Sequence, residues 1–315
     1  MGSHVHPATI PWKIITNIWA NIKPVIPPPS NNYVLQGSMQ GSAELVEAGY
    51  TQIHQYMRKI GWDYSEHPNS SSLDHKDGVH GEVIYDLFIR QYIFKLSIHA
   101  NEKALDGDRG KLIDRQRNEM KTQTTPSWYK LNGNWDEWQQ LKWKFKIPKD
   151  FRPSGSFTHL HQLKAQEGNN GSPVITITAR SNGNGSNRRI QIIHNGDTEE
   201  TTKGTIIDNL PLEDFEDEWI QVETEMHYTH NGSFSITLSR LSDGKRLVQR
   251  SFDDIDLWRE GAISIRNKFG IYRSFGKTLT DENDRPTNGI KDEHILLADF
   301  KVYEKNTNPD PQPHD

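Results

Sequence analysis

The stretch DEWIQVETEMHYTHNGSFSITLSRLSDGKRLVQRSF, residues 217–252, decides the fold class. Its first half alternates Trp, Gln and Glu with Ile, Val, Thr and Met, and then reaches Asn231-Gly232. Successive side chains of a β-strand point to opposite faces, and Asn-Gly is a strong hairpin turn signal. The chain then returns with the same period of two through Phe234, Ile236 and Leu238. This stretch therefore predicts an antiparallel hairpin with one buried face.

The same period of two continues over most of the chain. Ten or more strand-like segments lie between residues 83 and 304, many of them separated by Asn-Gly or Asp-Gly turns. No long helical pattern lies between them, which excludes alternating strand-helix-strand units and favours an all-β sandwich or jelly roll. One amphipathic helix is expected over residues 42–60, before the strands begin.

These patterns divide the chain into three parts. Residues 1–35 combine MGSHVH, which resembles an added tag, with a proline-rich arm that ends in KPVIPPPSNN. Residues 36–304 form the expected β-domain with its N-terminal helix. Residues 305–315 carry the polar sequence NTNPDPQPHD and are expected to be a disordered tail.

The composition excludes several classes of protein. The 315 residues include no cysteine and carry a formal net charge of −5, so disulfides are excluded and a nucleic-acid partner is not expected. No apolar run reaches the roughly 18 residues that a membrane-spanning helix needs. Nine Trp and ten Tyr in a chain that is only 33% hydrophobic favour aromatic platforms of the kind that bind sugars.

Three strands carry unusual polar faces. In IRNKFGIYRSFG, residues 265–276, Lys268, Gly270 and Tyr272 share one face, while the apolar neighbours share the other. In DRQRNEMK, residues 114–121, the odd positions are Arg115, Arg117, Glu119 and Lys121. Arg117 and Glu119 can pair with each other, which leaves Arg115 or Lys121 to meet an anion. The plainer alternative is a solvated strand with alternating charges.

The third strand contains the histidines of SFTHLHQLKAQ, residues 156–166. Strict alternation places Gln162 and Lys164 on one face and His159 and His161 on the other. His99 ends another strand, YIFKLSIHAN, on the face opposite its apolar residues. The sequence alone leaves open whether any of these histidines does more than occupy an exposed or structural position.

The three motifs together resemble those of the jelly-roll polysaccharide lyases, which include alginate lyases, glucuronan lyases and the heparin lyase I group. RNEM at residues 117–120 is similar to their Arg-x-Glu-hydrophobic motif, and QLK at residues 162–164 to Gln-hydrophobic-His. KFGIY at residues 268–272 matches Lys-x-Gly-x-Tyr at every specified position. Lys164 departs from the histidine of alginate lyases, which leaves that part to His99 or His159. The stretch IHANEKALDGDRGKLIDRQRNEMKT, residues 98–122, looks closest to the glucuronan-lyase and heparin-lyase-I side.

This resemblance implies a concanavalin-like two-sheet jelly roll that cleaves a uronic-acid polysaccharide by β-elimination. Tyr272 is implied as the acid or base, and Gly270 as leaving room for a sugar ring. The groups that would act on the substrate carboxylate are Arg117, Gln162 and His99. The implied substrate-binding residues are Arg115, Lys164, Lys268, His159 and Trp138. Trp128, Tyr129 and Trp135 are further candidates for stacking on sugars, although each could equally belong to the core.

Two other functions stay open on the sequence. A glycoside hydrolase on the same fold needs two carboxylates across a cleft, whereas a lectin-like module needs no catalytic group. An unsulfated glucuronate polymer is the first choice of substrate, because heparin-like chains call for a strongly basic cleft. A secreted or periplasmic monomer is expected, with no required cofactor. The acidic loops 106–110 and 280–293 could hold a structural Ca²⁺ through oxygen ligands.

Overall fold

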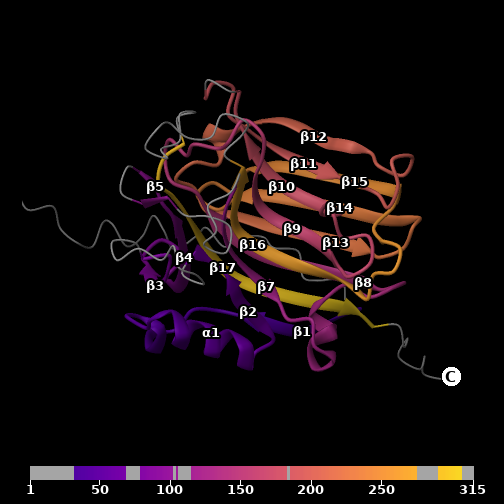
Figure 1. The fold of residues 1–315 in the computed structure, drawn as a ribbon, viewed down its shortest axis with the longest axis horizontal. Helices are drawn as coiled ribbons and strands as arrows, with labels where there is room; N and C mark the ends of the chain where they lie inside the picture. The colour runs from indigo at the N-terminus through magenta and orange to yellow at the C-terminus, as the bar shows by residue number, and fades with distance from the viewer. Residues whose placement is uncertain are drawn as a thin grey trace, which may run out of the picture. The chain divides into compact units, whose positions relative to one another are not determined.

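The computed structural model describes residues 32–68, 79–101, 104–105, 115–182, 185–274 and 290–306. Most of these residues lie in antiparallel strands that form two large sheets (Figure 1). Sheet A has the order β15-β14-β13-β8-β17-β4-β3, with β1 paired to β17. Its strands are β1 (Tyr33–Met39), β3 (Gly81–Asp86), β4 (Gln91–Ile98), β8 (Trp138–Lys146), β13 (Ile220–His227), β14 (Gly232–Arg240), β15 (Arg246–Ile255) and β17 (Glu293–Lys305).

Sheet B has the order β12-β11-β10-β9-β16-β7-β2. Its strands are β2 (Trp62–Glu66), β7 (Arg115–Thr122), β9 (Thr158–Gln166), β10 (Ile175–Arg180), β11 (Arg189–His194), β12 (Gly204–Pro211) and β16 (Ser264–Ser274). β5 (Ala100–Asn101) and β6 (Ala104–Leu105) form a separate short pair. The chain passes from one sheet to the other after β1, β2, β4 (by way of the β5–β6 pair), β7, β8, β12, β15 and β16. This arrangement confirms the predicted jelly-roll sandwich.

The helical part is shorter than predicted. A 3₁₀-helix covers Ala43–Leu45, and the α-helix α1 begins only at Tyr50 and ends at Lys59. The backbone is extended at Val46, and Glu47 has a positive φ of 65°, so a single helix cannot continue through these residues. Two more 3₁₀-helices cover Pro126–Leu131 and Leu212–Asp214. No helix among the described residues has both the length and the apolar character to cross a membrane.

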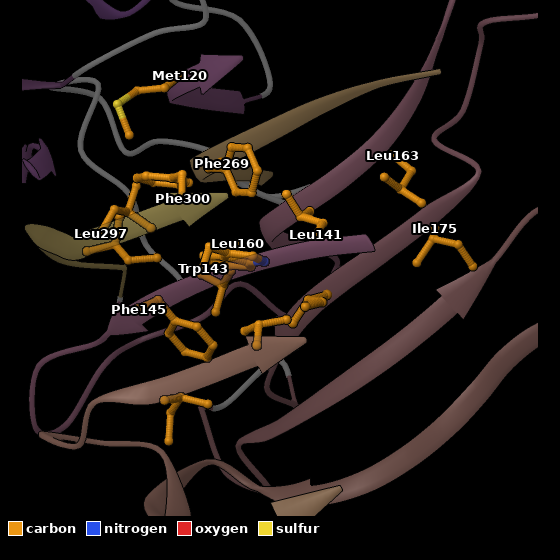
Figure 2. Packing of buried hydrophobic residues seen from close by; sticks show 14 of the residues in the cluster. Met120, Leu141, Trp143, Phe145, Leu160, Leu163, Ile175, Phe269, Leu297 and Phe300 are labelled. Carbon is orange, nitrogen blue, oxygen red and sulfur yellow. The ribbon is translucent and has the colours of Figure 1, made fainter. Parts of the chain in front are cut away.

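The core lies between the two sheets and follows from the alternation of each strand. Trp143 of β8 contacts Phe269 of β16 at a ring-centroid distance of 5.0 Å, and Phe300 of β17 lies 4.9 Å from Phe269 (Figure 2). All three side chains are fully buried. Removing one such aromatic side chain typically costs about 3–5 kcal/mol, because the cavity adds to the lost transfer energy. This aromatic contact holds β16, the strand with the Lys-x-Gly-x-Tyr motif, against sheet A.

A buried carboxyl lies where β17 begins. Glu293 is 3% exposed and accepts a hydrogen bond from the Arg152 backbone N–H at 2.7 Å. Burial raises the pKa of this carboxyl to about 7, although the Arg152 hydrogen bond and the charges of Arg273 and Lys291 oppose the change. Between its unfolded pKa and about pH 7, the folded protein therefore binds a proton that the unfolded chain has lost.

Glu293→Gln should make the stability of the protein less dependent on pH. A raised carboxyl pKa stabilises the folded state fully below the unfolded pKa, and this contribution is lost as pH rises through the folded pKa. The loss corresponds to about 3 kcal/mol. Urea unfolding measures the free energy of unfolding at pH 5 and at pH 8. From pH 5 to pH 8 this free energy should decrease more for the wild type than for the variant. Equal decreases for both proteins would show that Glu293 does not titrate in this range.

Candidate functional site

The candidate site lies on the outer face of sheet B, here called the polar face. Strand β7 directs Gln116 and Asn118 inward, where both are fully buried, and directs Arg117 and Glu119 to the polar face. In the register of β7 and β16, Tyr272 lies opposite Arg117, and Lys268 lies opposite Lys121. In the register of β16 and β9, Gln162 lies opposite Lys268. The structure thus brings the three motifs together on adjacent strands.

A β-bulge changes the face on which His159 lies. His161 pairs with Ile177 and His159 pairs with Thr178, so one extra residue of β9, Leu160, stands between two consecutive pairs. The prediction that His159 and Gln162 point to different faces of the sheet is therefore wrong, because the bulge interrupts the strict alternation of β9. The His159 ring lies 6.0 Å from the Tyr272 ring, and its Nδ1 is 2.7 Å from the Thr178 hydroxyl.

His161 lies on the face of β9 away from Gln162, as the alternation predicts, and the structure shows that this face is the interior. It is 2% exposed and packs against Trp143 and Phe269 at ring-centroid distances of 5.3 and 4.8 Å. Burial lowers the pKa of this imidazole to about 3, so it is neutral and belongs to the core.

Tyr272 has two guanidinium groups beside it. Arg115 donates a hydrogen bond from Nη1 to the Tyr272 hydroxyl oxygen at 2.9 Å. The guanidinium carbon of Arg117 lies 3.9 Å from the centre of the Tyr272 ring. The Phe157 ring covers another side of Tyr272, at a ring-centroid distance of 5.3 Å, and Tyr272 is 9% exposed. The hydroxyl therefore lies among cations on the polar face rather than in the apolar core, and these cations would stabilise a negative charge that develops on its oxygen.

Glu66 is the main residue that sequence reasoning missed. Its carboxylate accepts from Lys268 Nζ at 2.5 Å, Arg117 Nη1 at 2.6 Å and Lys121 Nζ at 2.8 Å. Burial would raise the pKa of this carboxyl, but the charges of Lys268, Lys121 and Arg117 hold it well below its usual range.

The pattern around Glu66 contains only part of the signal that would place it on the polar face. Trp62 and Tyr64 alternate with polar residues as in a strand, but the polar stretch DYSEHPNSSSLDHKDGVHG predicts a loop over residues 63–81. A register shift between Asp63 and Glu66 in the pairing of β2 with β7 then places Glu66 opposite Glu119. Local alternation does not reveal such a shift.

Gln162 and Lys268 are also engaged by a carboxylate of the chain. Gln162 donates a short hydrogen bond to Glu119 Oε1, and Lys268 Nζ lies 2.7 Å from Glu119 Oε2. Arg117 Nε is 3.9 Å from the same carboxylate, as its spacing from Glu119 in the sequence suggested. The Nη1 group of Arg117 and the amide of Gln162, expected to meet a substrate carboxylate, thus already donate to Glu66 and Glu119.

The structure does not bring His99 to the polar face. Gln116, which points inward from β7, donates to the His99 carbonyl at 2.7 Å. The His99 Nδ1 lies 3.2 Å from His80 Nε2, and His80 is 1% exposed. His99 therefore lies on the interior side of β7, whereas Tyr272 is on the other side of the sheet.

Trp138 and Gly270 also differ from their expected places. Trp138 belongs to sheet A, where it stacks on His227 at 4.6 Å and has Lys305 Nζ 4.7 Å from its ring. Gly270 has a φ of 147°, and a Cβ there would collide with the Asn118 carbonyl oxygen and the Glu119 Cα of β7. The close approach of β7, rather than room for a sugar ring, therefore requires glycine at this position.

The remaining predicted residues are Lys164, the stacking candidates and the calcium loops. Lys164 lies on the polar face, two residues beyond Gln162, and donates from Nζ to the Gly171 carbonyl at 3.1 Å. Trp135 is 53% exposed and contacts Trp258 and His230. Within the described ranges no group of three or more His, Asp or Glu residues has a metal-binding arrangement. Residues 106–110 and most of 280–293 lie outside those ranges.

Comparisons with known proteins find solved structures but no family match. The chain matches no protein-family model and no curated protein. An endo-β-1,4-glucuronan lyase from the fungus Trichoderma reesei is 13% identical, with 76% of this chain and 93% of that chain covered, at a TM-score of 0.48. An alginate lyase of polysaccharide lyase family 7 is 13% identical, with 78% of this chain and 95% of that chain covered, at a TM-score of 0.48. An alginate lyase from Pseudomonas aeruginosa is 11% identical, with 78% of this chain and 98% of that chain covered, at a TM-score of 0.45.

Glu66→Gln should destabilise the protein at neutral pH by about 3 kcal/mol, because it leaves buried cations without their counter-charge. The matched control is Glu82→Gln, since Glu82 pairs with Lys95 at 2.7 Å on the more exposed surface of sheet A. That change should cost less than about 1 kcal/mol. A depressed carboxyl pKa stabilises above the unfolded pKa, so the deficit of Glu66→Gln should shrink as pH falls below 4.5. Urea denaturation of all three proteins measures both effects, and equal costs for the two variants would contradict the assignment.

Proposed function

We propose that this protein is a polysaccharide lyase that cleaves a uronic-acid polymer, such as glucuronan, by β-elimination on the polar face of sheet B. The observation that carries the proposal is the environment of Tyr272. Its hydroxyl oxygen accepts a hydrogen bond from Arg115, and Arg117 lies over its ring. A tyrosine held in this way can exchange its proton while the cations stabilise the phenolate that remains.

The reaction breaks two bonds of the substrate. A base removes the C5 proton of the uronate, a double bond forms between C4 and C5, and the bond from C4 to the leaving oxygen O4 breaks. An acid then gives O4 a proton. Since the negative charge moves onto the carboxylate of the uronate, donors aimed at that group stabilise the transition state. Arg115 and Arg117 supply the positive charge beside Tyr272.

His159 has the properties of a neutral binding group rather than of a strong base. Burial lowers the pKa of its imidazole to about 3, and the charges of Arg180, Lys268, Lys164 and Arg117 act in the same direction. An effective general base has a pKa nearer the working pH. The Tyr272 hydroxyl, which has Arg115 and Arg117 beside it, is the group that we assign to both proton transfers. One residue that serves both sides of the bond requires a syn elimination. His159 would then hold the sugar by a hydrogen bond.

The alternative glycoside hydrolase fits the polar face less well. Hydrolysis requires one carboxyl as an acid and a second as a base or nucleophile. Glu66 and Glu119 are 2% and 0% exposed, and both are ion-paired to Lys268. The charges of Lys268, Lys121 and Arg117 hold the pKa of Glu66 well below its usual range, so Glu66 stays ionised and cannot act as the acid. A lectin-like module would need no tyrosine with paired guanidinium groups, and only an assay for bond cleavage separates it from a lyase.

Tyr272→Phe should abolish elimination, because it removes the only atom that exchanges the proton and leaves the ring in place. We expect a loss of about 10³-fold or more in kcat. The assay follows the ultraviolet absorbance of the unsaturated product with glucuronan, alginate and heparin as parallel substrates. Tyr85→Phe is the control, since Tyr85 is 47% exposed on sheet A. A folded Tyr272→Phe variant with near-normal activity would rule out the mechanism, and a wild type that releases only saturated sugars would rule out a lyase.

A further inference from the structure

Pairs of cations face each other across neighbouring strands of the polar face. Such pairs are destabilising unless an opposite charge lies between them. Three of them are evident from the strand registers, and they are Lys121 with Lys268, Arg189 with Arg180, and Lys164 with Arg266.

The protein supplies a carboxylate to the first two pairs. Glu66 bridges Lys121 and Lys268, with oxygen–nitrogen distances of 2.8 and 2.5 Å. Asp208 lies 3.5 Å from Arg189 Nε and accepts a hydrogen bond from Gln191 at 2.7 Å. Its charge also acts favourably on Arg180. In both places an acid of the chain offsets the repulsion between the two cations.

No acid bridges the third pair. Among the residues that the structure describes, no carboxylate is within ion-pair distance of Lys164 or Arg266. The charge of Glu119 acts favourably on Lys164 from farther away, but Glu119 itself pairs with Lys268 and Gln162. Lys164 donates only to the Gly171 carbonyl, and the buried Nε of Arg266 has no hydrogen-bond partner. A buried guanidinium N–H without an acceptor is costly. The pair therefore has the cations of a carboxylate site without the carboxylate.

We propose that Lys164 and Arg266 bind a carboxylate of the polysaccharide itself, on a sugar unit other than the one that is cleaved. The proposal rests on the proposed lyase function. Arg266 and Tyr272 are six residues apart on β16, which corresponds to about 20 Å at the usual rise of a strand. One pyranose ring does not span this distance, so the two groups act on different units of one chain.

This position of the carboxylate site defines the class of substrate. Polymers that carry an acid on successive units, such as a homopolymer of uronate, can occupy the Lys164–Arg266 pair and the Tyr272 region together. Short oligosaccharides, or polymers with isolated uronates, occupy only one of the two. We expect the preference to appear in binding and KM rather than in kcat, because Lys164 and Arg266 do not touch the reacting atoms.

The test compares long and short ligands in a background that does not cleave them. Calorimetry measures binding of 1,4-linked glucuronate hexasaccharide and trisaccharide to Tyr272→Phe and to Tyr272→Phe combined with Arg266→Gln. Loss of a charged hydrogen bond should weaken hexasaccharide binding about tenfold and leave trisaccharide binding unchanged. Lys301→Gln in the same background is the control for net charge, since Lys301 pairs with Asp299 on sheet A and should change neither affinity.

Stability provides a second readout that a purely structural arginine would not give. Arg266→Gln removes one of two opposed cations, so the free protein should be equally stable or more stable while the hexasaccharide binds more weakly. A structural role predicts the opposite, a decrease in Tm together with any loss of binding. The pKa of Lys164, which burial and the charges of Lys268, Arg266 and Arg117 lower to about 8, should also rise in this variant.

The outcomes separate this proposal from the proposed function. A wild type that cleaves the polymer, with equal KM values for wild type and Arg266→Gln, would overturn the carboxylate site alone. An equal loss of affinity for both oligosaccharides would also overturn it, because the pair would then act at the cleaved unit. A wild type that neither cleaves the polymer nor binds either oligosaccharide would overturn both proposals.

Discussion

Compensation of buried charge is the constraint on which the polar face of sheet B depends. Lys268 and Glu119 are almost fully buried, and Arg117 and Lys121 are nearly so. An ion in such a place is tolerated only when a counter-charge satisfies it, because desolvation costs several kcal/mol per ion. Glu66 and Glu119 provide that counter-charge. They hold the cations of β7 and β16 together on the face that carries Tyr272.

The same constraint connects stability with the proposed chemistry. The carboxylates hold Arg117 over the Tyr272 ring, and Arg115 is then the guanidinium that contacts the hydroxyl oxygen. Ion pairs fix these side chains before any substrate arrives, which is the preorganisation that electrostatic catalysis requires. Where the chain omits the carboxylate, at Lys164 and Arg266, the repulsion remains as a cost to the free protein that an acidic ligand would remove.

Two irregularities in strand pairing decide which residues reach this face. The bulge in β9 brings His159 beside Tyr272, and the register shift between β2 and β7 brings Glu66 beside Lys268 and Lys121. With regular pairing, His159 would point into the sandwich. A bulge reverses the direction of every side chain that follows it in the strand. One extra residue therefore changes which side chains line a site, although the residues of the strand stay the same.

The amino-acid sequence by itself determined the strands and most of their inner faces. Alternation and Asn-Gly turns are local signals, so they correctly predicted β4, β8, β13, β14 and β16 and the sandwich that these strands build. The resemblance to the polysaccharide lyases, and no pattern within a strand, implied that Arg117, Gln162 and Tyr272 share a face. Only the tertiary structure decided that Glu66 joins them, that His159 replaces His99 beside Tyr272, and that Gly270 is required by β7. These features depend on register and close approach between strands distant in sequence, and no periodicity within one strand encodes the position of its neighbour.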